Sequence, residues 1–166
     1  MISLFGEHIL SWLVFSPLIL GLIVLAVPND TGARWVALVG STLIFLFSIL
    51  IYQNFDPAIG TYQFAIQRDW LPLIGVKYNL GIDGISLYLV LLTTFLIPLI
   101  VLAAWRSVEE GVRKYLFFML FLEATVLGAF LSLDLFLFYV FWEAMLIPMF
   151  FLIGIWGSKE RIYAAQ

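Results

Sequence analysis

Five long runs of apolar residues, separated by segments that carry charges, prolines and glycines, form the main pattern of the chain. The runs cover about residues 9–27, 35–52, 85–104, 115–132 and 135–154. A helix needs about 20 consecutive apolar residues to cross the hydrocarbon core of a bilayer, so each run is long enough for one transmembrane helix. The pattern therefore predicts an all-α, polytopic membrane protein with five helices in a single membrane domain over residues 1–166.

The longest connection between two runs covers residues 53–84 and has a different pattern. Polar and apolar residues alternate in TYQFAIQ, residues 61–67, which predicts a short strand or hairpin. The segments DPAIG and WLPLIG supply prolines and glycines for turns. We expect this loop to form an ordered cap over helix ends rather than a flexible linker.

Composition agrees with the membrane assignment and excludes several classes of function. Hydrophobic residues make up 64% of the chain and charged residues only 11%, whereas about a quarter of the residues of a soluble domain are charged. The net charge of −3 gives no sign of a charged partner, and no basic segment favours nucleic acid. Without cysteine the chain has no disulfide and no thiolate ligand for an iron–sulfur cluster. We expect no cofactor and no metal in this chain.

The distribution of basic residues predicts the orientation. With the N-terminus outside, six basic residues fall on the inner side and two on the outer side, which satisfies the positive-inside rule. The inner residues are Arg34, Arg106, Arg113, Lys114, Lys159 and Arg161, and the outer ones are Arg68 and Lys77. The loop of residues 53–84 then lies outside.

Two glutamates interrupt the apolar runs, although an acidic residue at the centre of a bilayer costs about 2.5–3.5 kcal/mol on insertion scales. A tight turn at Leu133 and Asp134 joins the fourth and fifth helices, and Asp134 is expected to cap the fifth. Glu123 precedes this turn by ten residues and Glu143 follows Asp134 by nine. Both therefore lie about 14–15 Å from the surface, level with each other.

Glu143 has no cationic partner in the chain, because no Lys or Arg lies at mid-depth in any of the five runs. Its carboxyl group must be protonated, share a proton with Glu123, reach water, or meet a cation from elsewhere. A carboxyl group in this position can take up and release protons, and Tyr139, one turn earlier, can hydrogen-bond to it. The simpler alternative is a permanently neutral glutamic acid that holds two helices together.

Gly128 and Gly154 are interpreted as close-packing positions.

Two stretches resemble the subunit M family of respiratory complex I, whose mitochondrial counterpart is chain four. They are YNLGIDGISLYLVLLTTFLIPLIVLAAW, residues 78–105, and LSLDLFLFYVFWEAMLIPMFFLIGIWGSKERIYAA, residues 131–165. The motif FWEAMLIPMFFLIGIWG is specific to the family. Sister subunits L and N and multisubunit sodium/proton antiporters share its Trp–Glu pair but match the surrounding residues less well.

The resemblance implies a role for each of these sites. Glu143 occupies the position of the family's essential, proton-carrying glutamate in the first half-channel, and Glu123 lies where many members also have a carboxylate. GIDGIS, residues 81–86, with Asp83 and Ser86, marks the outer entry to the third helix and is expected to be structural. The family has about fourteen helices with two inverted five-helix repeats, and a lysine on the seventh helix is the partner of the glutamate. This sequence ends at RIYAAQ, before the first repeat, so that lysine is expected in a separate chain or in residues that are missing.

By this resemblance we expect a membrane-arm subunit of proton-pumping NADH:quinone oxidoreductase that contributes part of a half-channel centred on a buried glutamate. Its partners would be other membrane-arm subunits, especially the neighbouring antiporter-like ones, together with the lipid bilayer and protons. NADH, FMN, iron–sulfur clusters and quinone would bind to other subunits. The expected location is a bacterial inner (plasma) membrane. The alternatives are a subunit of a multisubunit cation/proton antiporter or membrane hydrogenase, and a truncated structural subunit without transport activity.

Overall fold

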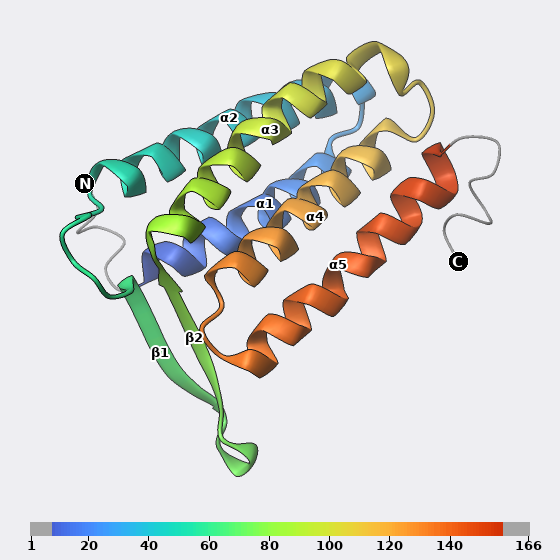
Figure 1. The fold of residues 1–166 in the computed structure, drawn as a ribbon. Coiled ribbons are helices and arrows are strands. Elements are labelled where there is room, and N and C mark those ends of the chain that lie inside the picture. Colours follow the sequence, from blue (N-terminus) through green and yellow to red (C-terminus); the bar gives the residue numbers. More distant parts are fainter. Residues whose placement is uncertain (1–7, 158–166) are drawn as a thin grey trace.

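Five helices make up most of the computed structural model, which describes residues 8–157 (Figure 1). They are α1 Ile9–Ala26, α2 Asp30–Gln53, α3 Gly84–Ser107, α4 Val112–Leu131 and α5 Leu135–Trp156. Each is long and apolar enough to cross a membrane, so the predicted set of five helices is confirmed. The largest difference in bounds is at α2, which begins five residues before its apolar run. The side chain of Asn29 accepts a hydrogen bond from the backbone N–H of Gly32 and caps this polar first turn.

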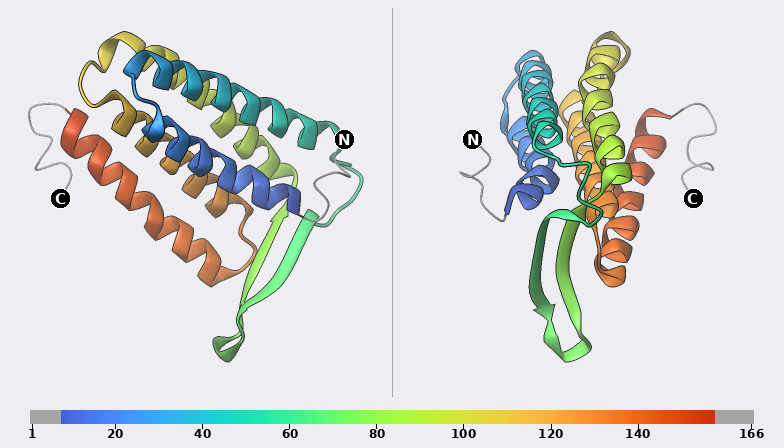
Figure 2. Two further views of the ribbon diagram at one scale, coloured as in Figure 1. Left: turned by 180° about the vertical axis from the view of Figure 1, so that it is seen from behind. Right: turned by 60° about the vertical axis from the view of Figure 1, so that its left-hand side comes forward.

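The helices form two layers. One layer holds α1 and α2, and the other holds α3, α4 and α5 (Figure 2). Between the layers α1 packs against α4 and α2 packs against α3. Because α4 lies between α3 and α5, the fifth helix packs mainly against α4 and has no helix opposite it among the described residues. This edge position decides how α5 presents its side chains.

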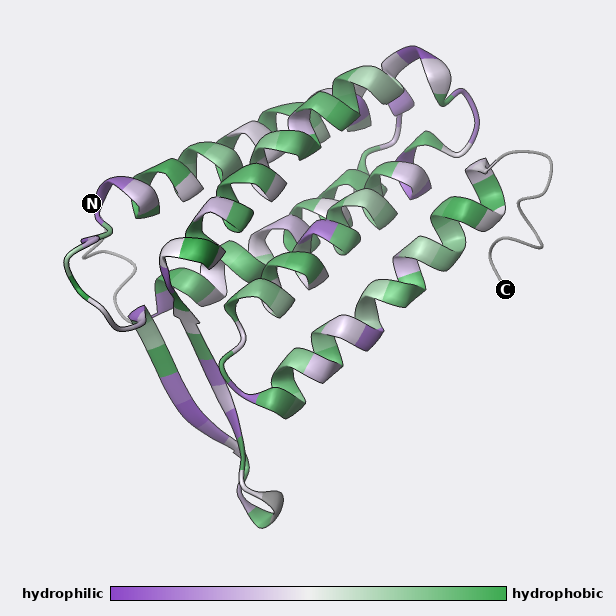
Figure 3. Cartoon of the chain, viewed as in Figure 1, coloured by the Kyte–Doolittle hydropathy of each residue, from purple (hydrophilic) through white to green (hydrophobic). Residues whose placement is uncertain are grey.

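Apolar side chains from α1 to α4 fill the space between the layers. Leu10, Leu13, Leu120 and Leu127 are fully buried there, whereas α5 buries only Leu137 and Pro148. Figure 3 shows that the helices are hydrophobic along most of their length, with hydrophilic residues concentrated in the hairpin and at the helix ends. The membrane-spanning surface of the described chain is therefore largely apolar, as a lipid environment requires.

The loop between α2 and α3 contains the predicted hairpin. Strand β1 Gln63–Leu71 pairs antiparallel with β2 Val76–Ile82 across a short 3-10 turn, Pro72–Ile74. Gly75 follows this turn with a φ of 71°, a backbone conformation that favours glycine. The hairpin is tied to the helices, since the hydroxyl groups of Ser11 and Tyr78 hydrogen-bond at 2.9 Å.

The expected cap over the helix ends is only partly realised. The backbone N–H of Leu133 donates to the carbonyl of Asn79 at 2.9 Å, so β2 covers the turn between α4 and α5. The turn end of the hairpin extends beyond the helices (Figure 1).

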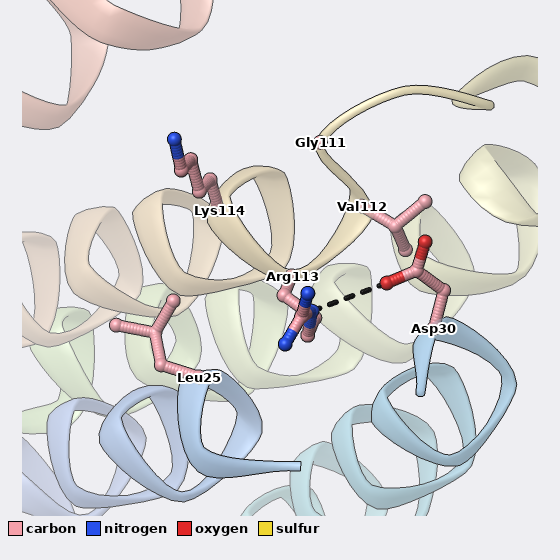
Figure 4. Close-up of a pocket in the computed structure, with 6 residues that line it drawn as sticks. All are labelled: Leu25, Asp30, Gly111, Val112, Arg113 and Lys114. Atoms are coloured by element: carbon pink, nitrogen blue, oxygen red, sulfur yellow. Dashed lines mark ion pairs between the residues drawn. The ribbon is translucent and has the colours of Figure 1, made fainter. Parts of the chain in front are cut away.

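Arginine side chains connect the helices at the opposite end, which is the inner end in the predicted orientation. The guanidinium group of Arg34 in α2 donates to the carbonyls of Trp105 and Val108 at the end of α3. Arg113 in α4 pairs with Asp30 at 3.2 Å (Figure 4). Lys159 and Arg161, which also entered the orientation argument, lie outside the described residues, and the orientation stays a prediction.

Candidate functional site: two carboxyl groups on a helical hairpin

The turn between α4 and α5 fixes the level of the two glutamates. The carboxylate of Asp134 accepts hydrogen bonds from the backbone N–H groups of Phe136 at 2.9 Å and Leu137 at 3.1 Å, so its predicted capping role is confirmed. These bonds and one from the backbone N–H of Lys77 hold the pKa of Asp134 below its usual value, and the bond from Leu137 has the largest effect. An ionised cap also interacts favourably with the positive end of the helix dipole.

Glu123 and Glu143 lie at the same level on this hairpin. Glu123 precedes the last residue of α4 by eight positions, and Glu143 follows the first residue of α5 by eight positions. At 1.5 Å per residue each lies about 12 Å along its helix from the turn. Both therefore lie away from the ends of helices that are long enough to cross a membrane.

The side chain of Glu123 is enclosed by the protein. It is 1% exposed, and neither carboxyl oxygen has a hydrogen-bond partner among residues 8–157. An unpaired carboxylate in such a place would carry a desolvation penalty far above that of a neutral carboxyl group. The arrangement therefore favours the protonated form of Glu123.

Glu143 faces the other way and is exposed on the described chain. Tyr139, one turn earlier and 56% exposed, lies on the same face, and its hydroxyl group interacts with the carboxyl group of Glu143. The glutamate that the sequence predicts inside the membrane is therefore not covered by any other part of residues 8–157. The reason is the edge position of α5, which leaves the side away from α4 open.

The structure does not bring the two carboxyl groups together. Since both oxygens of Glu123 lack a hydrogen-bond partner in the described part of the chain, the shared proton considered from the sequence is not formed there. The two glutamates are level but separate, one enclosed and one presented outward. The sequence predicts that the two residues lie level on the hairpin, whereas it makes no prediction of the direction in which each side chain points.

The remaining chemistry of the described residues is sparse. Across residues 8–157, no group of three or more His, Cys, Asp or Glu side chains is arranged to hold a metal ion. A cavity of about 310 Å³ lies at the inner end, lined by residues that include Leu25, Asp30 and Arg113. Figure 4 shows that Arg113 points to Asp30 while Lys114 points away from the pair. The cavity is far along α4 from Glu123, so it does not belong to the pair of glutamates.

A family model described as NADH-ubiquinone oxidoreductase chain 4, amino terminus, matches residues 11–133. A second, described as NADH:quinone oxidoreductase/Mrp antiporter, TM, matches residues 132–166. NADH-quinone oxidoreductase subunit M of Rhodobacter capsulatus is 47% identical over 165 residues, which cover 96% of this chain and 32% of that protein. NADH-ubiquinone oxidoreductase chain 4 of Arabidopsis thaliana is 41% identical over 92% of this chain and 31% of that protein.

A solved structure gives the same result. The chain is similar to a chain of respiratory complex I from Thermus thermophilus with bound NADH, with a TM-score of 0.81 and 30% sequence identity. The match covers 94% of this chain and 31% of that one. The chain thus spans about a third of the length of the relatives that it matches.

Proposed function

Because the chain belongs to the chain 4 family of NADH:quinone oxidoreductase, also called subunit M in bacteria, we propose that it supplies part of a proton-translocating half-channel in that enzyme's membrane arm. The observation that carries this proposal is the position of Glu143. It is an ionisable group about 12 Å along α5 from the turn with α4, in a helix long enough to cross a membrane, on a helix face that the described chain leaves open. Such residues face a bundle interior or a water-filled path rather than lipid.

Each polar group has a role in this proposal. Glu143 binds and releases the proton that crosses this part of the membrane. Tyr139 donates a hydrogen bond that orients the Glu143 carboxyl group, which is supported by their interaction on one face of α5. Glu123 holds a second proton in the apolar interior and takes a weaker part in transfer, which is supported by its full enclosure without partners.

The charge partner of Glu143 is proposed to lie outside this sequence. No Lys or Arg occurs at mid-depth in the five helices, and the resemblance to the family implies a lysine on a later helix. A cation that approaches the open face of α5 would favour the ionised form of Glu143, and its departure would favour the protonated form. Alternation between the two would drive uptake and release.

The redox chemistry is proposed to occur elsewhere in the complex. NADH, FMN, iron–sulfur clusters and quinone would bind to other subunits, and this chain would contact further antiporter-like subunits of the membrane arm. We place the complex in the plasma membrane of a bacterium. The chain would thus belong to a translocase without holding a redox centre of its own.

An antiporter without a redox partner is the second candidate, because the family model for residues 132–166 names the Mrp antiporters as well. The model for residues 11–133 names chain 4 alone, which favours the oxidoreductase. Purification of the tagged, full-length protein from its native membrane separates the two. Flavin and iron–sulfur subunits in the purified complex support the oxidoreductase, and their absence supports the antiporter.

The test of the proton-carrying role is Glu143→Gln in the full-length protein, assembled in its complex. Glutamine keeps the size of the side chain and loses the exchangeable proton, so pumping per NADH oxidised should fall by about 100-fold or more. The measurement is acidification of inside-out membrane vesicles during NADH oxidation. The amount of assembled complex, judged on native gels, should be unchanged.

Glu109→Gln is the matched control, because Glu109 is an exposed glutamate in the loop between α3 and α4. It should pump normally. A Glu143→Gln complex that assembles and pumps at the normal ratio would rule out the proposed role and favour a purely structural subunit.

A further inference from the structure

We propose that Gly128 and Phe141 form a positioning pair, whose contact sets the rotation of α5 about its axis and thereby the direction of the Glu143 carboxyl group. This inference rests on the proposed proton-carrying role of Glu143. It assigns a task in that role to two residues that bear no ionisable group.

The contact between the two residues requires glycine at position 128. A Cβ atom there would lie 2.5 Å from Cε1 and 2.6 Å from Cγ of Phe141, closer than real Cβ atoms approach other heavy atoms. The ring of Phe141 therefore lies directly against the backbone of α4. The ring also lies beside Phe15 of α1, with ring centroids 6.4 Å apart. Phe141 is thus wedged between α4 and α1.

The other ring contacts and hydrogen bonds between α5 and the rest of the described chain lie nearer to the ends of α5. Asp134 caps the outer end. Toward the inner end Phe151 stacks on Phe118 with centroids 4.7 Å apart, and the indole N–H of Trp156 donates to the carbonyl of Glu110 at 2.9 Å. Phe151 follows Glu143 by eight residues, or about 12 Å along the helix. The contact of Phe141 with Gly128 is therefore the nearest of these contacts to the carboxyl group of Glu143.

The geometry of a helix links this wedge to the direction of Glu143. Successive residues turn by about 100°, so Glu143 follows Phe141 by about 200° and points to the opposite side of α5. Tyr139 precedes Phe141 by the same angle and lies on the same outward face as Glu143. With Phe141 seated on Gly128, both polar side chains turn away from α4 toward the open side.

A methyl group at position 128 would disturb this arrangement in a defined way. To reach an ordinary contact of 3.4 Å, an atom now 2.5 Å away must move by about 0.9 Å. Rotation of the ring about its Cβ–Cγ bond gives no relief, because Cγ lies on that axis and is itself too close. The ring must leave its place or α5 must shift or turn. Displacement of a reacting group by about 1 Å can lower a rate by about 100-fold.

The experiment compares four variants of the full-length protein in its assembled complex. Gly128→Ala introduces the clash, and Gly128→Ala with Phe141→Leu replaces the ring by a smaller apolar side chain that still packs against α4. Gly60→Ala is the control for glycine replacement, since a Cβ at position 60 meets nothing within 4 Å. Gly40→Ala is the control for crowding, because a Cβ at position 40 meets Leu20 between α2 and α1 rather than α5.

Two quantities are measured for each variant, with the amount of assembled complex as the reference. The first is the number of protons pumped per NADH oxidised. The second is the rate at which a hydrophobic carbodiimide modifies Glu143, followed by mass spectrometry of the modified peptide. The second quantity reports the surroundings of the carboxyl group and would not respond to a loss of packing elsewhere in the protein.

We expect Gly128→Ala to lower pumping per NADH by at least tenfold, toward about 100-fold, and to change the modification rate of Glu143 severalfold. The double variant should restore both quantities, and the two control variants should leave both unchanged per assembled complex. Should Gly128→Ala fail to assemble, Phe141→Ala removes the wedge without crowding, and it should change the modification rate of Glu143 in the same experiment.

Normal pumping and a normal modification rate in assembled Gly128→Ala, or an effect that Phe141→Leu does not reverse, would overturn the assignment of the pair. The result with Glu143→Gln separates this failure from failure of the proposed function. If Glu143→Gln abolishes pumping while Gly128→Ala changes nothing, only the positioning pair is wrong. If Glu143→Gln pumps normally, both are wrong.

Discussion

Replacement of Glu123 by methionine should make the protein more stable, which is unusual for a buried position. The carboxyl group of Glu123 is 1% exposed and has no hydrogen-bond partner among the described residues. A buried polar group without a partner costs about 1–3 kcal/mol. Methionine has a similar length and no polar hydrogen, and such volume-conserving changes cost less than about 1.5 kcal/mol. We therefore expect the free energy of unfolding to rise by about 1 kcal/mol for Glu123→Met.

Ser48→Ala provides a control with the opposite sign. Ser48 is also fully buried between helices, but its hydroxyl group hydrogen-bonds with Thr94 at 2.8 Å. Loss of such a bond between membrane helices costs about 0.6 kcal/mol on average. Both variants can be measured by equilibrium unfolding of the purified full-length protein in mixed micelles with increasing dodecyl sulfate, followed by tryptophan fluorescence.

The sign of the change decides between two interpretations of Glu123. If its carboxyl group holds helices together through a hydrogen bond, Glu123→Met should destabilise the protein as Ser48→Ala does. Destabilisation by 1 kcal/mol or more would refute the reasoning from the unpaired oxygens. Stabilisation together with slower proton pumping would show that the group is retained for transfer at the expense of stability. Stabilisation with unchanged pumping would remove Glu123 from the proposed path.

Two further predictions concern the ends of α3. Arg34→Lys should lower the free energy of unfolding by about 1.5–3 kcal/mol. The single ammonium group of lysine cannot reproduce the two diverging hydrogen bonds of the guanidinium group to the carbonyls of Trp105 and Val108. An unchanged unfolding midpoint would contradict this. The hydrogen bond from the backbone N–H of Ser86 has the largest effect on the pKa of Asp83, and the bond from the Ser86 hydroxyl group has the next largest. Both hold this pKa below its usual value of 3.8. The ionised cap therefore stabilises α3 above pH 3.8, and this stabilisation is lost as the pH falls through the lowered pKa. The stability difference between wild type and Asp83→Asn, measured by thermal unfolding across this range, should therefore shrink on acidification, and a difference that is constant with pH would contradict it.

The fold was predictable wherever local chemistry determines it. The number of helices follows from the length of the apolar runs, because a bilayer imposes that length. The helix start at Asp134 follows from the preference of a short acidic side chain for the N-cap position, and this cap is present. Asp83 also caps its helix, although the resemblance marks it only as a structural residue at the entry to the third helix. The start of α2 was missed because the apolar run marks only the part of a helix that lies in hydrocarbon. The polar turn that begins at Asp30 belongs to the same helix and precedes that run.

The hairpin shows where local chemistry stops being sufficient. Alternation in the sequence and the turn at Gly75 predict two strands and their connection. Nothing in the alternation states how far the strands extend beyond the helices. That direction depends on contacts between distant residues, such as the hydrogen bond between the hydroxyl groups of Ser11 and Tyr78. The register is also irregular between Asp69 and Leu71, and a pattern of period two does not predict such a bulge.

The direction of Glu143 was not predictable from the sequence of α5, because that helix is apolar on every side and its pattern distinguishes no buried face. Depth follows from counting residues, whereas direction follows from the position of α5 at the edge of its layer and from the close contact of Phe141 with Gly128. The outcome is an acidic side chain exposed at a level where exposure to lipid is expensive. A carboxyl group that faced lipid in this position would destabilise the protein, whereas one that contacts a polar segment of another part of the protein or of a partner would be a functional site. The exposure of Glu143 therefore supports the proposal that its charge partner approaches from the open side of α5, away from Glu123.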